Sequence, residues 1–145
     1  MTAAALPDGL AEARDAFLEL PEPDRLTLLL EYSGELPEVP DRLTDHPELF
    51  ERVAECQSPV YIIVEIDGDI VLLHATAPAE APTTRGFASI LVQGLSGVSV
   101  AEALAVSEDF PQSLGLRRVV SPLRLSGMTG MLIRIKRQIR ERAAQ

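Results

Sequence analysis

The run Val60-Tyr-Ile-Ile-Val-Glu-Ile-Asp-Gly-Asp-Ile-Val-Leu-Leu-His-Ala75 sets the architecture of this chain. Its two apolar halves, 60–66 and 69–75, are rich in β-branched residues, which favour strands. Between them lies Asp67-Gly68, a dipeptide typical of two-residue hairpin turns, because both central residues of a type I′ turn need positive φ. The run therefore predicts an antiparallel hairpin.

Helical patterns precede this hairpin. The spacing of apolar residues predicts helices over 8–20, with Asp8 as N-cap, and over 24–32. A connector rich in proline and acid, over 36–47, is expected to form no regular element. A weak third strand is predicted around 50–55.

Helical patterns also follow the hairpin, after a loop predicted over 75–82. Ser99-Val-Ala-Glu102 is a capping box that opens a short helix, and Ser126 is the expected N-cap of the last helix. The predicted helical segments are 85–95, 99–104, 109–114 and 127–143. Because strands and helices are segregated along the chain, the sequence predicts an α+β fold, a small three-stranded antiparallel meander flanked by N- and C-terminal helices. The length of 145 residues predicts a single domain over 1–145.

Composition narrows the class of protein. The net charge of −9 disfavours nucleic acid as a partner, and no apolar run approaches the ~20 residues of a membrane helix. The start of the chain carries no basic residue and no apolar core, so no secretory leader is expected. With one unpaired cysteine, these features predict a cytoplasmic protein.

The charge is unevenly distributed. Residues 1–80 hold 18 of the 22 acids, and residues 117–142 hold 8 of the 13 bases. This pattern fits either a solvated acidic face with a basic last helix or a surface that steers a protein partner of opposite charge. Both interpretations stay open at this point.

Cys56 is the single cysteine of the chain, so it can form no internal disulfide and no multi-cysteine metal site. It is a buried apolar residue, a nucleophile or a carrier of a covalently attached group. Its polar neighbours predict a partly exposed loop. The nearby carboxylates of Glu51 and Glu55 are expected to raise the pKa of its thiol.

The predicted turn fixes a register that places Cys56 relative to other residues. A turn at Asp67-Gly68 pairs residues whose numbers sum to 135, which puts Cys56 at the open end of the hairpin, opposite Ala79 and near Glu80. The same register pairs His74 with Tyr61, roughly 16 Å along the strand from Cys56. His74 is therefore expected to be a half-buried structural residue and no base for Cys56, and His46 is expected to be exposed.

An ordered set of motifs resembles the SufE family, the sulfur-acceptor partners of cysteine desulfurases in iron–sulfur cluster assembly. The motifs, spread over about residues 14 to 140, are Cys56-Gln-Ser-Pro-Val-Tyr61, Arg85-Gly86, Leu114-Gly-Leu116, Ser121-Pro-Leu-Arg124 and Gly127-Met128. The resemblance implies a SufE/NifU-like α+β fold with a three-stranded meander. It also implies a cysteine at a loop tip that accepts a persulfide.

Carried over residue by residue, the resemblance makes Cys56 the persulfide acceptor. Gln57 and Ser58 belong to its loop, and Arg124 matches the arginine of the Ser/Thr-Pro-x-Arg motif. Glu80 matches an acid that precedes the Arg/Lys-Gly pair, here Arg85-Gly86. The matched positions other than Cys56 are candidates for supporting or partner-contacting roles. One departure is Glu55, where the family commonly has glycine, which takes positive φ at less cost.

These residues lead us to expect a sulfur carrier and no enzyme in its own right. It would take sulfur from a SufS-like, pyridoxal-phosphate-dependent desulfurase, stimulate that enzyme and pass sulfur to a SufBCD-type scaffold, with no metal and no bound cofactor. The alternatives are a self-contained cysteine-nucleophile sulfurtransferase or thiol hydrolase, an iron–sulfur scaffold, and an interaction module in which Cys56 is inert.

Overall fold

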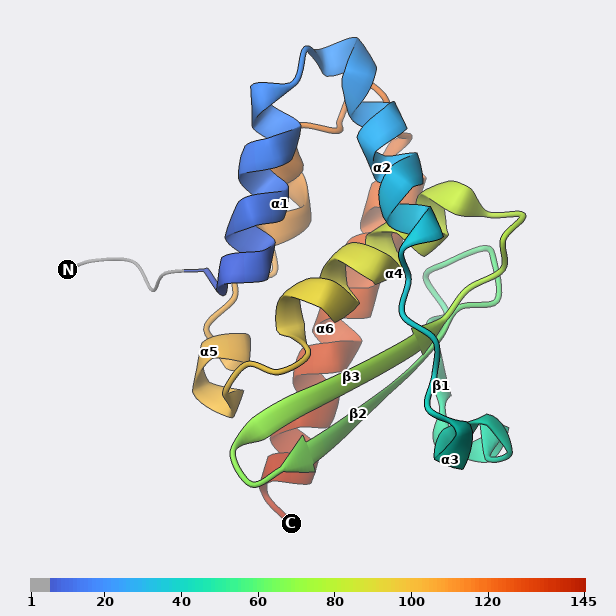
Figure 1. Cartoon of the computed structure of the whole chain (residues 1–145), viewed down its shortest axis with the longest axis vertical. Helices are drawn as coiled ribbons and strands as arrows, with labels where there is room; N and C mark the ends of the chain where they lie inside the picture. Colours follow the sequence, from blue (N-terminus) through green and yellow to red (C-terminus); the bar gives the residue numbers. More distant parts are fainter. Residues whose placement is uncertain (1–5) are drawn as a thin grey trace, which may run out of the picture.

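Figure 1 shows a computed structural model of the chain, which describes residues 6–145. Residues 1–5 lie outside that range, and the prediction about a secretory leader falls largely on them. Within 6–145, no helix is both long enough and apolar enough to cross a membrane. The α-helices are α1 (Asp8–Glu19), α2 (Arg25–Gly34), α3 (Asp41–Thr44), α4 (Pro82–Leu95), α5 (Val100–Leu104) and α6 (Pro122–Ala143), and 3-10 helices cover Glu22–Asp24, Pro47–Leu49 and Phe110–Leu114. The strands are β1 (Glu51–Arg52), β2 (Tyr61–Asp67) and β3 (Ile70–Thr76).

The three strands form one antiparallel sheet in the order β1-β2-β3. The α+β class and the three-stranded meander are therefore confirmed. β1, the weak strand, is only two residues long and pairs Glu51 with Ile62 and Arg52 with Tyr61.

The hairpin register differs from the prediction. Asp67 pairs with Ile70, so the two-residue turn is Gly68-Asp69 and paired residues sum to 137. Of the described residues, only glycines have positive φ, and Gly68 has a φ of 63°. Positive φ at the first turn position alone is what a type II′ turn requires, and this frees Asp67 to extend the strand. Because the shift is two positions, each side chain keeps its predicted face.

Helix α4 crosses the middle of the molecule between the sheet and the N-terminal helices (Figure 1). It packs against β3 and α6 on one side and against α1 and α2 on the other. Helix α6 packs against β2 and presents its apolar residues at helical spacing, all of them buried as predicted: Met128, Met131, Leu132, Ile135 and Ile139.

Two helices begin earlier than predicted. α6 begins at Pro122, with the Ser121 hydroxyl accepting a hydrogen bond from the Arg124 backbone N–H, so Ser121 and not Ser126 is the N-cap. α4 begins at Pro82 instead of residue 85. In both cases proline occupies the first turn, where its missing N–H is no loss and its fixed φ already suits a helix.

Two smaller predictions were also wrong. The connector over 36–47 contains the one-turn helix α3, held by a hydrogen bond from Thr44 Oγ1 to the Asp41 carbonyl and by burial of Leu43. Asp8 is the first residue of α1 and caps nothing with its side chain, because Pro7 occupies the N-cap position. The Ser99 cap of α5 is confirmed, since its hydroxyl accepts from the Glu102 N–H.

Candidate functional site

Cys56 lies in the loop that joins β1 to β2, at the end of the hairpin opposite the β2–β3 turn (Figure 1). The loop is closed at its base by a hydrogen bond from the Val53 N–H to the Val60 carbonyl. Inside it, the Cys56 N–H donates to the Val53 carbonyl at 3.1 Å. Pro59 interrupts regular pairing, so β2 begins only at Tyr61.

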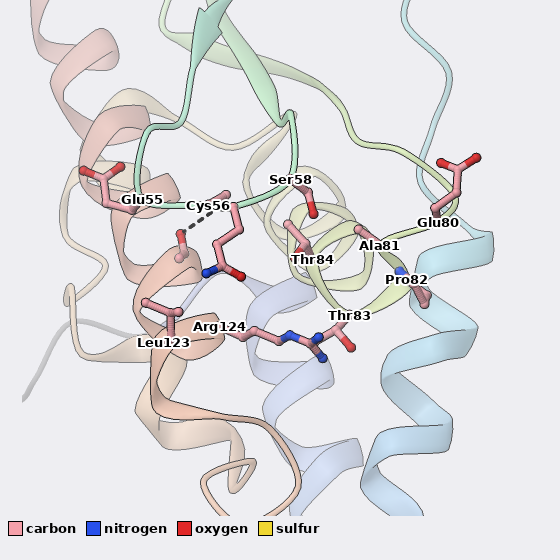
Figure 2. A pocket seen from close by; sticks show the side chains of 12 residues that line it. Glu55, Cys56, Ser58, Glu80, Ala81, Pro82, Thr83, Thr84, Leu123 and Arg124 are labelled. Atoms are coloured by element: carbon pink, nitrogen blue, oxygen red, sulfur yellow. Dashed lines mark hydrogen bonds between the residues drawn. The ribbon is translucent and has the colours of Figure 1, made fainter.

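The cysteine loop is partly exposed, as its polar residues predicted, but the Cys56 side chain itself is buried. Only 6% of the residue is exposed. Its Sγ points toward the first turns of α6 and lies 3.7 Å from the Gly127 carbonyl oxygen, a long, weak contact (Figure 2). The polar neighbours Glu55 and Gln57 are exposed, whereas the cysteine between them points inward.

Burial raises the pKa of the Cys56 thiol from its ordinary 9.0 to about 11, and the negative charge of Glu55 adds to the increase. The Arg134 guanidinium acts in the opposite direction but does not offset these two effects. Cys56 is therefore a neutral thiol near pH 7, as the nearby carboxylates predicted, although burial is the larger cause. A neutral thiol is a poor nucleophile.

A cavity of about 380 Å³ opens beside the thiol. Three segments form it: the cysteine loop, the start of α4 and the start of α6 (Figure 2). Its lining residues are Glu55, Cys56, Gln57, Ser58, Glu80, Ala81, Pro82, Thr83, Thr84, Leu123, Arg124 and Gly127.

The cavity brings together most of the residues that the sequence singled out. Cys56, Gln57, Ser58, Glu80 and Arg124 all line it. Regular pairing of β2 with β3 ends at Tyr61 and Thr76, and beyond that pair the cysteine loop and the loop that carries Glu80 border the same cavity. The conclusion drawn from the predicted register, that Cys56 lies near the loop after β3, is therefore unchanged.

Arg85 is the exception, because it does not line this cavity. Its Nε donates to the Ser33 carbonyl at 3.0 Å, and its Nη1 donates to the Ala77 carbonyl at 2.5 Å. Arg85 thus ties the end of α2 to the loop after β3. This contact is structural and holds the segment that carries Glu80.

Arg124 extends across the cavity toward Thr83 (Figure 2). Among residues 6–145, its guanidinium has no carboxylate within ion-pair distance. The first turns of α4 and α6 border the same space, and helix N-termini carry partial positive charge. Glu55 and Glu80 point outward at the rim (Figure 2). The interior of the cavity is therefore suited to an anion.

Glu55 forms a two-pronged ion pair with Arg134 of α6. Arg134 Nε donates to Oε1 of Glu55 at 2.8 Å, and Nη2 donates to Oε2 at 3.2 Å. This pairing lowers the pKa of the Glu55 carboxyl. No described residue other than glycine has positive φ, so Glu55 adopts an ordinary backbone conformation in place of the family's usual glycine.

The histidines do not border the cavity. His74 is half-buried and its Nε2 lies 3.1 Å from Glu65 Oε1, whereas His46 is exposed beside Glu48. The structural interpretation of His74 is confirmed. Within residues 6–145, no three His, Cys, Asp or Glu side chains are grouped as a metal ion would require.

Sequence reasoning missed Thr83, Thr84 and Leu123 of the lining, because the starts of α4 and α6 were placed too late. It also missed Arg134. The spacing of Gly127, Gly130 and Arg134 gave a signal for it, since residues three and four apart lie on one face of a helix. That face is the one against which the cysteine loop packs.

Comparison with known proteins identifies the family. The model of the SufE family, a domain associated with Fe–S metabolism, matches residues 11–139. An uncharacterized SufE-like protein of Mycobacterium tuberculosis is 53% identical over 143 residues, covering 97% of this chain and 99% of the relative. A SufE-like protein of Synechocystis is 27% identical, covering 88% of this chain and 77% of its own.

Among solved structures, the solution structure of a hypothetical protein from Thermus thermophilus is similar, with a TM-score of 0.83. It is 35% identical in sequence, and the match covers 97% of this chain and all of that one. The matched family model spans the cysteine loop, the start of α4 and most of α6, so it includes every segment of the cavity. The chain belongs to the SufE family, whose domain is associated with Fe–S metabolism.

Proposed function

We propose that this protein accepts sulfur from a cysteine desulfurase as a persulfide on Cys56. The observation that carries the proposal is the position of this single cysteine at the wall of a cavity bordered by Arg124 and two helix N-termini. Membership of a family associated with Fe–S metabolism supports the same role.

The transfer is a thiol–persulfide exchange. The Cys56 thiolate attacks the outer sulfur of the persulfide on the desulfurase cysteine and forms a new sulfur–sulfur bond. The old bond breaks, its electron pair stays on the desulfurase cysteine, and that thiolate takes up a proton. No electrons are gained or lost overall, so the step needs one accessible thiol and neither a metal nor a cofactor.

The resting state of Cys56 gives the partner an essential part in this reaction. With 6% of the residue exposed, transfer requires the cysteine loop, residues 54–59, to move away from α6. With a pKa of about 11, the thiol must also lose its proton in an environment more favourable to the anion, such as the desulfurase active site. By removing sulfur from the desulfurase, the acceptor stimulates its turnover.

The cavity fits the loaded state. A persulfide extends the side chain by one sulfur–sulfur bond of about 2.05 Å. On the α6 side there is no space, since even a methyl group on Gly127 would lie 3.1 Å from Sγ. The outer sulfur, as an anion, instead enters the cavity toward Arg124. From there it passes to a SufBCD-type assembly scaffold.

The test is to mix the protein with a purified SufS-like cysteine desulfurase and L-cysteine and to measure the intact mass. We expect a gain of one sulfur atom, and no gain for Cys56→Ser, which is an unambiguous control because the chain has no other cysteine. Faster alanine production by the desulfurase should accompany it. No adduct with any desulfurase would refute the proposal.

A second assay, on the isolated protein, separates the carrier from a self-contained sulfurtransferase or thiol hydrolase. Such an enzyme needs a base within hydrogen-bond reach of Cys56, and neither histidine borders the cavity. We expect the isolated protein to show no turnover of thiosulfate or of a thioester.

A further inference from the structure

The cysteine loop, residues 54–59, has few polar ties to the rest of the molecule. Within the described part of the chain, its side chains make hydrogen bonds outward at only two residues, Glu55 and Cys56. The Cys56 contact is a long thiol hydrogen bond of 3.7 Å. The charged, two-pronged contact of Glu55 with Arg134 is therefore the main polar tie that holds the loop against α6.

Arg134 is fixed independently of the loop. Its Nη1 donates to Oε2 of Glu51 in β1 at 2.6 Å. Glu51 in turn accepts hydrogen bonds from Arg137 and from Nε2 of Gln138. Gln138 is buried, and its Oε1 accepts from the Val64 N–H of β2 at 2.8 Å. Arg134 thus belongs to a network anchored in the sheet, and Glu55 belongs to the loop.

Because Arg134 has a second carboxylate partner, the Glu55–Arg134 ion pair can break with a small loss of free energy. When the loop leaves α6, Glu55 enters water, and Arg134 keeps the carboxylate of Glu51 as its partner. Breaking a buried ion pair is costly when one charge stays buried without a counter-ion. Here neither charge is left in that state. The side chains of Glu55 and Arg134 are 44% and 25% exposed, so the contact itself is weak enough to be reversible.

Two glycines on α6 form the surface against which the cysteine loop packs. A methyl group on Gly130 would lie 2.7 Å from Cγ and 2.8 Å from Cβ of Glu55, and one on Gly127 would lie 3.1 Å from Cys56 Sγ. The absence of side chains at these positions lets the loop lie flat on the helix. In that position the Glu55 carboxylate meets the guanidinium of Arg134.

We propose that the Glu55–Arg134 pair is a latch that sets how often the cysteine loop opens. Arg134 is the fixed half, a positioning residue that never touches the transferred sulfur, and Glu55 is the moving half. The role of this latch in sulfur transfer rests on the proposed acceptor function. The existence of the latch can be tested without that function, because opening of the loop is measured on the isolated protein.

The discriminating variant is Arg134→Gln, tested by alkylation of Cys56 with iodoacetamide over a range of pH. The positive charge of Arg134 lowers the pKa of the Cys56 thiol, so electrostatics alone would make the variant react more slowly. Loss of the latch would make it react faster. Fitting the pH profile separates the thiol pKa from the limiting rate, which reports opening.

We expect the limiting rate to rise about two- to five-fold, the range that a partly exposed ion pair allows. Arg137→Gln is the matched control, because Arg137 contacts Glu51 on the same helix face but does not touch Glu55. Its limiting rate should be unchanged. An equal rise in both variants, or no rise in Arg134→Gln, would overturn the latch.

Two further measurements exclude general destabilisation as the cause. The double variant Glu55→Gln/Arg134→Gln should open no faster than either single variant, since each removes the same contact. Added salt should accelerate opening of the unmodified protein but not of Arg134→Gln. Additive effects in the double variant, or equal salt dependence in both proteins, would contradict the proposal.

Discussion

The two ends of the β2–β3 hairpin are held in different ways. At the turn end, backbone hydrogen bonds fix the chain: the Val100 N–H donates to the Asp69 carbonyl at 2.9 Å, and the Val71 N–H donates to the Val98 carbonyl at 2.8 Å. At the other end, side chains hold the cysteine loop to α6 through Glu55 and Cys56. Both ends lie on the same sheet and belong to the same core.

The difference determines at which end of the hairpin less structure must be broken for local opening. Opening the turn end would break backbone hydrogen bonds of the sheet and uncover its fully buried residues, such as Val71. Opening the loop end breaks one partly exposed ion pair and one weak thiol contact. Local opening therefore requires much less free energy at the loop end. Three experiments test this comparison.

The largest expected effect concerns the pH dependence of stability. The folded state raises the pKa of Cys56 to about 11, so above its ordinary value of 9.0 the unfolded chain loses the proton first. The free energy of unfolding should therefore be highest below pH 9 and fall as the pH rises through 11, by up to roughly 3 kcal/mol. Denaturant titrations of the protein and of Cys56→Ser measure this difference.

If the free energy of unfolding falls by less than this with rising pH, the size of the fall reports the free energy of opening the cysteine loop. If opening releases the thiolate before the protein unfolds, the loss stops at the free energy of opening. Equal pH dependence in the protein and in Cys56→Ser would show that the thiol is not held in its buried, neutral form.

A medium effect is expected at the turn end. Gly68→Ala places a side chain at a φ of 63°, which should lower the free energy of unfolding by about 1–2 kcal/mol. The alkylation rate of Cys56 should stay the same, because the loop opens without the turn. Asp69→Ala, at the second turn position, where φ is not positive, is the control and should cost less. Faster alkylation in Gly68→Ala would mean that the two ends open together.

The smallest effect on stability is expected at the loop end. Gly130→Ala pushes Glu55 away from α6, while alanine favours the helix by up to ~1 kcal/mol. We expect a melting temperature that is unchanged or higher, together with a few-fold faster alkylation of Cys56. Gly34→Ala is a suitable control, because no atom lies within 4 Å of the added methyl group. Slower alkylation in Gly130→Ala would contradict the role given to this glycine.

Much of the fold could be predicted from local patterns. The hairpin strands, the α+β class and the buried face of α6 follow from side-chain periodicity, which depends on nearest neighbours in the chain. The turn was misplaced by one residue because Asp67-Gly68 and Gly68-Asp69 both fit two-residue turns of different types. The starts of α4 and α6 were predicted too late, because the helices were begun at the first clear apolar periodicity, whereas Pro82 and Pro122 occupy the first turns, a position that suits proline.

The candidate site was predictable only in part. Family motifs indicated Cys56, Gln57, Ser58, Glu80 and Arg124, and the structure places all five around one cavity. Arg85, taken from the same motifs, instead holds Ser33 and Ala77 through their carbonyl oxygens. A motif records which residues recur together and does not distinguish a residue that contacts a ligand from one that supports the backbone.

The amino-acid sequence alone established a solitary thiol, a hairpin beside it and the absence of a histidine within reach of it. It did not establish that the thiol is buried, or that Glu55 meets an arginine 79 residues later in the chain. Local structure follows from backbone preferences and periodicity over a few residues. Burial and ion pairing depend instead on which distant segments pack together, here the flat face that Gly127 and Gly130 give to α6. For that reason the single cysteine could be identified from the sequence, whereas its burial and the ion pair of its neighbour Glu55 were decided only by the tertiary structure.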